Sequence, residues 1–283
     1  MNAIVTPLFV FASALFAQSA GASVAEKSKS VGIVYSLAAN PVNLHEPVTL
    51  SVNVHNNGPE SITLRLGQDQ KGGYLLALTP PDGHQVMLQK PEHSGISIPG
   101  DVLISTGETF TQKLVLNEWY DFHALGEYKL EVRIVRPLLV GKAATQVQDS
   151  GFKGTLQIRP RDAASLTVQC ERLTTKIKNT ESLEKAAEPA LELSYINDPV
   201  AVTYIHQAMD QQPSLAFILI PGLKRIGNDE AVEVLLSSLR SPREMTAGLA
   251  RSALLGLEDK ITNPSLKETV RRSLSQEVSN SHQ

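Results

Sequence analysis

From residue 31 to residue 160, apolar and polar side chains alternate in short runs, the pattern of β-strands with one buried face. The run over residues 48–54 is the clearest, and the turn-forming sequence Asn-Asn-Gly-Pro ends it. Pro80-Pro81-Asp82-Gly83 predicts a hairpin, because its glycine accepts the positive φ that such turns need. The pattern predicts at least seven strands, over residues 48–54, 62–66, 74–78, 85–88, 109–116, 128–135 and 155–159.

Many short strands without an intervening helical pattern predict an antiparallel β-sandwich over residues 31–160. Tyr128 begins one strand after Leu-Gly-Glu, as in a tyrosine corner, where the hydroxyl bonds to nearby backbone. Residues 105–110 (Ser-Thr-Gly-Glu-Thr-Phe) and the strand residues 113–116 resemble a segment of bacterial immunoglobulin-like modules. These modules include proteinase-inhibitor-like domains and accessory domains of secreted peptidases. The resemblance covers about residues 40–135 and implies an immunoglobulin-like fold.

Beyond residue 160 the apolar residues recur at helical spacing, and the chain resembles itself. Residues 196–202 align with residues 226–232 at a shift of 30 residues, and a weaker third copy begins near residue 255. Asp198-Pro199 and Asn263-Pro264 predict helix starts, because the first side chain accepts a backbone N–H and proline needs no acceptor. Ser241 and Glu244 are spaced as a capping box, which predicts a third start.

Residues 223–236 (LKRIGNDEAVEVLL) resemble the HEAT repeats of phycobilisome-lyase-like proteins, in which an Ile-Gly-Asp turn precedes an Ala-Val pair. The resemblance covers about residues 181–278 and implies a C-terminal α-helical solenoid that binds partners on its concave face. The sequence departs from the family pattern in its shorter period and in a third copy without the Ala-Val pair. Pro189 and Pro221 fall inside apparent helices, where we expect a kink or an early end.

Residues 161–180 predict a connecting or capping helix between the two units. Its apolar side chains, Leu166, Cys170, Leu173 and Ile177, form one stripe. Because a short array of repeats exposes an apolar end unless it is capped, we expect this stripe to pack on the first repeat. The sandwich should then cover the outer side of the helix, and residues 279–283 should form a disordered tail.

The first 25 residues have the organisation of a signal peptide. An apolar run over residues 3–16 is too short to cross a bilayer, and small residues then offer cleavage after Ala22 or Ala25. No Lys or Arg precedes the run, so an uncleaved membrane anchor is the alternative. We expect an exported protein, periplasmic or extracellular, without a membrane span after cleavage.

Composition narrows the class of protein further. With 283 residues, 42% hydrophobic and 19% charged, the chain has ample apolar material for a folded core. The net charge of −3 is spread evenly over both halves and favours no nucleic-acid partner. The single cysteine, Cys170, cannot form an internal disulfide, and its helical position favours a small buried hydrophobe over a nucleophile.

Motifs of common catalytic and metal sites are missing from the sequence. It has no His-Glu-x-x-His, no Cys-x-x-Cys, no Gly-x-Ser-x-Gly, no phosphate loop and no dinucleotide fingerprint. The pairs His45–Glu46 and Glu92–His93 lie in loop-like sequence, where a solvated surface is more typical than a metal site. We therefore expect no catalytic residue, no cofactor and no metal.

Two groups of side chains are candidates for binding a protein partner of unknown identity. The first is the aromatic cluster Trp119, Tyr120, Phe122 and His123, which contains the only tryptophan. Its alternative is to fold back and cap the sandwich near Tyr128. The second group is Lys224 and Arg225, for which a solvated helix face is the alternative.

The sequence thus favours a protein-interaction or scaffolding function carried by the repeats, by loops of the sandwich, or by both. Two other functions stay open. One is a proteinase inhibitor that acts through sandwich loops, and the other is an accessory subunit of a secreted hydrolase. The oligomeric state is not indicated.

Overall fold

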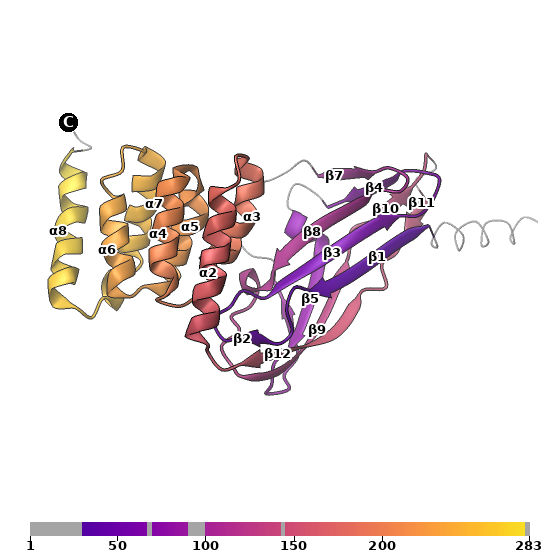
Figure 1. The fold of residues 1–283 in the computed structure, drawn as a ribbon, viewed down its shortest axis with the longest axis horizontal. Helices are drawn as coiled ribbons and strands as arrows, with labels where there is room; N and C mark the ends of the chain where they lie inside the picture. Colours follow the sequence, from indigo (N-terminus) through magenta and orange to yellow (C-terminus); the bar gives the residue numbers. More distant parts are fainter. Residues whose placement is uncertain (1–29, 67–69, 90–99, 143–144, 281–283) are drawn as a thin grey trace, which may run out of the picture.

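The computed structural model describes residues 30–66, 70–89, 100–142 and 145–280, and it has a β-rich region followed by a helical region (Figure 1). The predicted order of β-structure and then helices is confirmed. The expected signal peptide, residues 1–25, lies outside the described residues. Helix α8 (Pro264–Asn280) continues past residue 278, so the expected tail does not begin at residue 279. In the described parts of the chain, no helix is long and apolar enough to cross a lipid bilayer.

The strands form three sheets whose order differs from the order along the chain. The first sheet has the order β1 (Val31–Leu37), β3 (Thr49–Asn56), β8 (Thr109–Val115). The second has the order β11 (Thr145–Val147), β10 (Leu138–Val140), β4 (Ile62–Arg65), β7 (Asp101–Ile104). The third has the order β2 (Val42–Asn43), β12 (Phe152–Arg159), β9 (Gly126–Ile134), β5 (Tyr74–Thr79), β6 (Val86–Leu88).

Among the residues that the structure describes, the paired strands are antiparallel with one exception. The two residues of β2 pair in parallel with the end of β12, so the third sheet is mixed. The prediction of a purely antiparallel structure was wrong at this pair. It joins segments more than a hundred residues apart, and the periodicity and turn signals that predict strands contain no information on such distant pairing.

One hydrophobic core lies among the three sheets. Strand β3 buries alternate residues, with Leu50, Val52 and Val54 fully buried, as the sequence pattern predicted. The hydroxyl of Tyr128 donates a hydrogen bond to the carbonyl oxygen of Ala124 at 3.0 Å, which confirms the predicted contact of this tyrosine with nearby backbone. Gly83 adopts a φ of 85° in the hairpin between β5 and β6, as its turn requires.

Seven α-helices follow in the described part of the chain, and they pack in two layers (Figure 1). In one layer α2 contacts α4, α4 contacts α6, and α6 contacts α8, while in the other layer α3 contacts α5 and α5 contacts α7. A second hydrophobic core fills the space between them and includes the whole predicted stripe of α2, which is fully buried. The helices are α2 (Ala163–Lys178), α3 (Leu183–Ser194), α4 (Ala201–Gln211), α5 (Ala216–Ile226), α6 (Asp229–Ser238), α7 (Glu244–Leu255) and α8.

The helix starts test the capping predictions. Asn263 caps α8 as predicted, since its side-chain oxygen accepts from the N–H of Leu266 at 3.3 Å. The predicted capping box at Ser241 was wrong, whereas Asp198 accepts a backbone N–H as predicted, in a turn just before its helix. Helix α7 begins only at Glu244, because Ser241 accepts from the N–H of Arg243 and forms a turn instead of a capping box. Helix α4 begins at Ala201, after a turn in which Asp198 accepts from the N–H of Val200.

The two internal prolines neither end nor break their helices. Pro189 lies inside α3 and Pro221 inside α5, so the expected early ends were wrong. A proline inside a helix costs about 3 kcal/mol because it removes a backbone hydrogen bond and crowds the preceding turn. The apolar neighbours, such as Ala190 and Leu193 in α3 and Leu219 and Leu223 in α5, are fully buried. Their burial holds the chain in helical form.

The contact of α3 with α5 depends on a glycine, which yields a first prediction. A Cβ on Gly222 would lie 2.8 Å from the carbonyl oxygen and 2.9 Å from the Cα of Ser194, so the two backbones touch there. We expect Gly222→Ala to lower the free energy of unfolding by about 1–3 kcal/mol through overpacking. Gly248→Ala in α7 is the matched control, because a Cβ there meets nothing within 4 Å. It should raise stability by about 0.5–1 kcal/mol. Urea denaturation measures both, and equal effects would contradict this packing.

Cys170 yields a second prediction. Its side chain is fully buried in the helical core, and this burial raises the pKa of the thiol to about 12. Because the thiolate is the reactive form, we expect no labelling by an aromatic disulfide reagent in native buffer at neutral pH. One thiol per chain should react after unfolding in guanidinium. Stoichiometric labelling of the native protein within minutes would show that this core is open.

Candidate functional site

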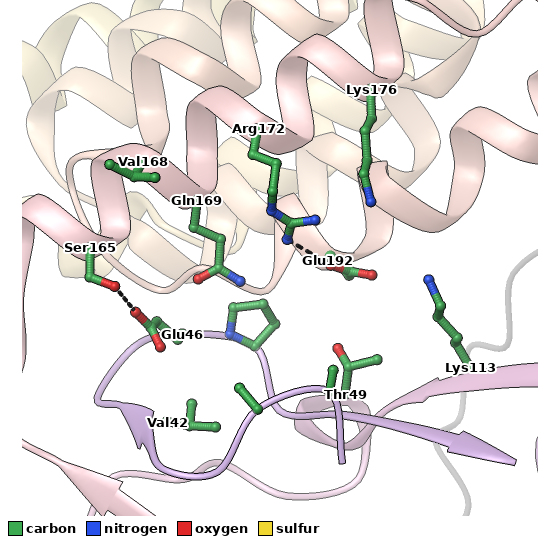
Figure 2. A pocket seen from close by; sticks show the side chains of 13 residues that line it. Val42, Glu46, Thr49, Lys113, Ser165, Val168, Gln169, Arg172, Lys176 and Glu192 are labelled. Atoms are coloured by element: carbon green, nitrogen blue, oxygen red, sulfur yellow. Dashed lines mark hydrogen bonds and ion pairs between the residues drawn. The ribbon is translucent and has the colours of Figure 1, made fainter. Parts of the chain in front are cut away.

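Helices α2 and α3 are the helices next to the sheets, and the surface of α2 has two faces with different roles (Figure 1). One face is the buried apolar stripe. The other face carries Ser165, Val168, Gln169, Arg172 and Lys176, whose spacing of three or four residues aligns them on the helix surface. These five side chains line one wall of a cleft of about 380 Å³ (Figure 2).

The β-rich region forms the opposite wall of the cleft. The segment after β1 provides Ala38 and Ala39, and the loop between β2 and β3 provides Glu46 and Pro47. Lys113 reaches the cleft from β8, while Glu192 closes it from α3. Figure 2 shows Ser165 and Glu46 near one end of the cleft, with Lys176 and Lys113 near the other. The site therefore exists only where the two parts of the chain meet.

Glu46 joins the two walls. One of its carboxylate oxygens accepts from the Ser165 hydroxyl at 2.6 Å and from the Asn43 side-chain amide at 3.0 Å. The other oxygen accepts from the backbone N–H of Asn43 at 2.9 Å. Three donors thus satisfy this carboxylate and fix the β2–β3 loop against α2.

The cations of the cleft differ in how well they are paired. The guanidinium of Arg172 lies 3.6 Å from the buried carboxylate of Glu192. Lys113 forms an ion pair with Glu188 of α3. The ammonium group of Lys176 points into the cleft, and no residue that the structure describes forms a hydrogen bond or ion pair with this group (Figure 2). One positive charge therefore remains available at this end.

Arg161 and Asp198 join the β-rich region to the helices near the start of α2, and so help to fix the two walls of the cleft. Arg161 follows the last strand, and its guanidinium binds both carboxylate oxygens of Asp198, with the Nη2–Oδ1 distance at 3.0 Å. Asp198 lies in the turn between α3 and α4 and is 1% exposed. The hydrogen bonds from Arg161 hold the pKa of the Asp198 carboxyl below its usual range. This bidentate pair fixes the end of β12 against the helices.

A second charged contact crosses the junction at Glu118, whose side chain is 4% exposed. Burial raises the pKa of the Glu118 carboxyl, and the nearby charges of Lys71 and Arg225 oppose this shift. Lys71 forms an ion pair with Glu118 and lies 6.0 Å above the ring centroid of Trp119. One member of each predicted binding group therefore lies near this carboxylate: Trp119 follows it in the chain, and the charge of Arg225 acts on it.

The rest of the aromatic cluster folds back onto the β-rich core. Phe122 is buried, with its ring centroid 5.3 Å from that of Tyr128, and Tyr120 packs edge-on against both rings. The structure has the stated alternative at Phe122, whose ring packs into the β-rich core, while binding of a partner by the other members of the cluster stays a prediction. His123 is exposed, with Nδ1 2.9 Å from the carbonyl oxygen of Asp121.

Lys224 and Arg225 serve neighbouring helices. Arg225 stacks 3.9 Å over the Tyr195 ring and donates to the carbonyl oxygen of Ser194, the last residue of α3. Lys224 lies over Gly256, at the end of α7, where a Cβ would approach its Nζ to 2.7 Å. Cations at the C-terminal ends of helices are favourable, because the carbonyl groups there carry partial negative charge. Arg225 therefore has partners within the chain, while binding of a protein partner by the exposed residues Lys224 and Arg225 stays a prediction.

The cleft itself was not predicted from the sequence. The signal that could have indicated it is the second stripe of α2, in which Val168 is apolar on an otherwise polar face. A stripe on one helix does not show what lies opposite, and the facing residues come from three separate segments. Among the described residues, no group of three or more His, Cys, Asp and Glu side chains is placed to hold a metal ion.

No protein-family model matches the sequence, and no curated protein matches it. Solved structures match parts of the chain. An X-ray structure of a Northeast Structural Genomics Consortium target is 11% identical, with 45% of this chain and 84% of that chain covered and a TM-score of 0.26. The sporulation control protein Spo0M from Bacillus subtilis is 14% identical, with 50% and 55% covered and a TM-score of 0.28.

A β-glucosidase from Listeria innocua in complex with glucose is 12% identical, and the match covers 45% of this chain at a TM-score of 0.22. The chain spans only 16% of that enzyme. Because the TM-scores of these matches are so low, they carry no argument about fold or function.

The Asp198 pair yields a third prediction. A carboxyl whose folded pKa is lowered contributes stability above its unfolded pKa, about 3.9, and this contribution is lost as the pH falls through the folded value. We expect the melting temperature of the wild type to fall more between about pH 5 and pH 2 than that of Asp198→Asn. Asp210→Asn is the control, because the Asp210 side chain is 73% exposed, and it should follow the wild type. Parallel curves for all three proteins would show that the pair does not stabilise the fold.

Proposed function

We propose that this chain is an exported, non-catalytic protein that binds a protein partner, built from an immunoglobulin-like β-sandwich and a HEAT-like helical array. Export rests on the N-terminal sequence, with its short apolar run and small residues before Ser23 and Glu26. The lack of a catalytic role rests on the missing sequence motifs.

The immunoglobulin-like assignment is supported by the way the sheets pack. Antiparallel pairs enclose one core, and residues from the first and third sheets alternate into it. The contact of Tyr128 with Ala124 at the start of β9 adds a feature common in such sandwiches. The parallel β2–β12 pair is compatible with this assignment, since it lies at the edge of its sheet.

The HEAT-like assignment is supported by the two-layer packing in chain order. The internal similarity places Ile196 and Ile226 at equivalent points, one after α3 and the other at the end of α5. Each leads through a turn into a helix of the other layer. Such stacking of helix pairs is typical of solenoids, in which each repeat contacts mainly its neighbours.

The observation that carries the binding function is the cleft between α2 and the β-rich region. Its walls come from both units, and hydrogen bonds and ion pairs at Glu46, Lys113 and Arg161 hold them together. Val168 is 65% exposed on the wall, and with Ala38 and Ala39 it gives the cleft an apolar surface beside its charged groups. A concave site with apolar surface and a few placed polar groups is typical of a binding site.

The inhibitor and accessory-subunit alternatives receive less support. An inhibitor that acts through the aromatic loop would need exposed anchors, whereas Phe122 is buried and Trp119 and Tyr120 are partly buried. An accessory subunit of a hydrolase would also bind a protein. It is therefore one form of the proposed function.

Site-specific photocrosslinking tests this proposal and is the fourth prediction. A benzophenone amino acid replaces Gln169 in the cleft or Gln207, an exposed position on α4, in the full chain expressed in its source cells. We expect ultraviolet light to produce a discrete protein adduct from position 169 and none from position 207. No adduct from position 169, or the same adducts from both positions, would contradict a partner in the cleft.

A further inference from the structure

We propose that the cleft between α2 and the β-rich region binds a short acidic peptide segment of a partner protein, with an apolar side chain on the same face of the segment as the acidic one. This inference rests on the proposed protein-binding function and names the chemistry of the segment. The volume of the cleft, about 380 Å³, supports a small occupant, and the distribution of its charges supports a singly charged one.

The charge balance of the cleft favours a ligand with one carboxylate group. Glu46 is satisfied by three donors, Arg172 is balanced by Glu192, and Lys113 is balanced by Glu188. Only Lys176 is left without a partner among the described residues that surround it. A single free ammonium matches a monoanion. A phosphate dianion or a nucleic-acid backbone would meet the carboxylates of Glu46 and Glu192 without enough cations to offset them.

The apolar part of the cleft favours an apolar side chain in the same peptide segment as the ligand carboxylate. Val168 lines the wall, together with Ala38, Ala39 and Pro47. Figure 2 places Val168 toward the Ser165 end, away from Lys176 and Lys113. An extended peptide presents every second side chain on one face, about 7 Å apart, so one segment can place a Leu or Val against Val168 and a Glu or Asp, two or four residues further on, at Lys176.

The test is the fifth prediction and uses the full chain with methyl groups of Val and Ala labelled for NMR. The probe is the blocked, singly charged peptide Leu-Ser-Leu-Ser-Glu, whose Leu and Glu side chains share one face when it is extended, with Leu-Ser-Leu-Ser-Gln and Leu-Ser-Leu-Ser-Lys as comparisons. We expect the acidic peptide to shift the methyl signals of Val168, Ala38 and Ala39 saturably. The uncharged peptide should bind about three- to tenfold more weakly, and the basic peptide should not shift these signals.

Two variants of helix α2 test the role of the unpaired cation. Lys176→Gln should raise the dissociation constant of the acidic peptide about three- to tenfold, because it removes the unpaired cation. Lys178→Gln makes the same change of charge two residues further along α2, outside the cleft lining, and should leave the constant within about twofold of the wild type. Both are surface changes, so both proteins should fold.

The outcomes separate this inference from the proposed function. Equal binding of the acidic and uncharged peptides, equal effects of Lys176→Gln and Lys178→Gln, or no shift of the Val168 methyl signals would overturn the acidic-peptide inference. A crosslinked adduct at position 169 that forms equally well in Lys176→Gln would also overturn it, while the protein-binding function would stand. Failure of the adduct itself contradicts the function.

Discussion

The orientation of helix α2 about its own axis determines which of its side chains face the β-rich region. Leu166, Cys170, Leu173 and Ile177 are fully buried against the other helices, and burial of four such side chains is worth several kcal/mol, at about 1.5–3 kcal/mol for each large one. A helix held by this stripe cannot turn without exposing it. The opposite face, from Ser165 to Lys176, is therefore fixed toward the sheets, and its side chains become one wall of the cleft.

Buried carboxylates then connect the two parts of the chain. Asp198 belongs to the helices and receives its guanidinium from Arg161, at the end of the β-rich region. Glu118 belongs to the β-rich region and is close to Arg225 of α5. Separating the two parts would leave the Asp198 carboxylate without its main partner, and an unpaired buried charge is strongly unfavourable. The same side chains that join the two units therefore also keep the cleft walls in register.

Local signals in the sequence predicted the elements well. The alternation in β3, the turn at Gly83 and the stripe of α2 each depend on neighbours within a few residues, and all three appear as expected. Pairing between distant segments was not predictable in the same way. The parallel β2–β12 pair and the contact of Glu46 with Ser165 both join residues more than a hundred positions apart. No periodicity encodes such contacts.

The candidate site shows the same difference between local sequence signals and long-range contacts, and shows it more clearly. Trp119, Phe122, Lys224 and Arg225 attracted attention because aromatic anchors and basic residues are common in interfaces. In the structure, such side chains have a second use: Phe122 fills a core, and Arg225 binds the end of a neighbouring helix. Val168 and Lys176 gave only a weak signal, although they are the residues whose binding capacity stays unused among their described neighbours. Whether a side chain is still able to bind a ligand depends on all the contacts it already makes. This could be determined only when the folded surroundings of each residue were known.

The position of the cleft has a consequence for how a partner would bind. Its two walls are held by hydrogen bonds and ion pairs that are already formed in the free protein, at Glu46, Lys113 and Arg161. A ligand that enters a preformed site loses less free energy to ordering than one that must bring two flexible parts together. An acidic segment in the cleft would contact α2 and the β-rich region at the same time. Its affinity would therefore depend on the Arg161–Asp198 pair, although neither residue lines the cleft. This coupling connects the stability of the junction directly to the binding function proposed for it.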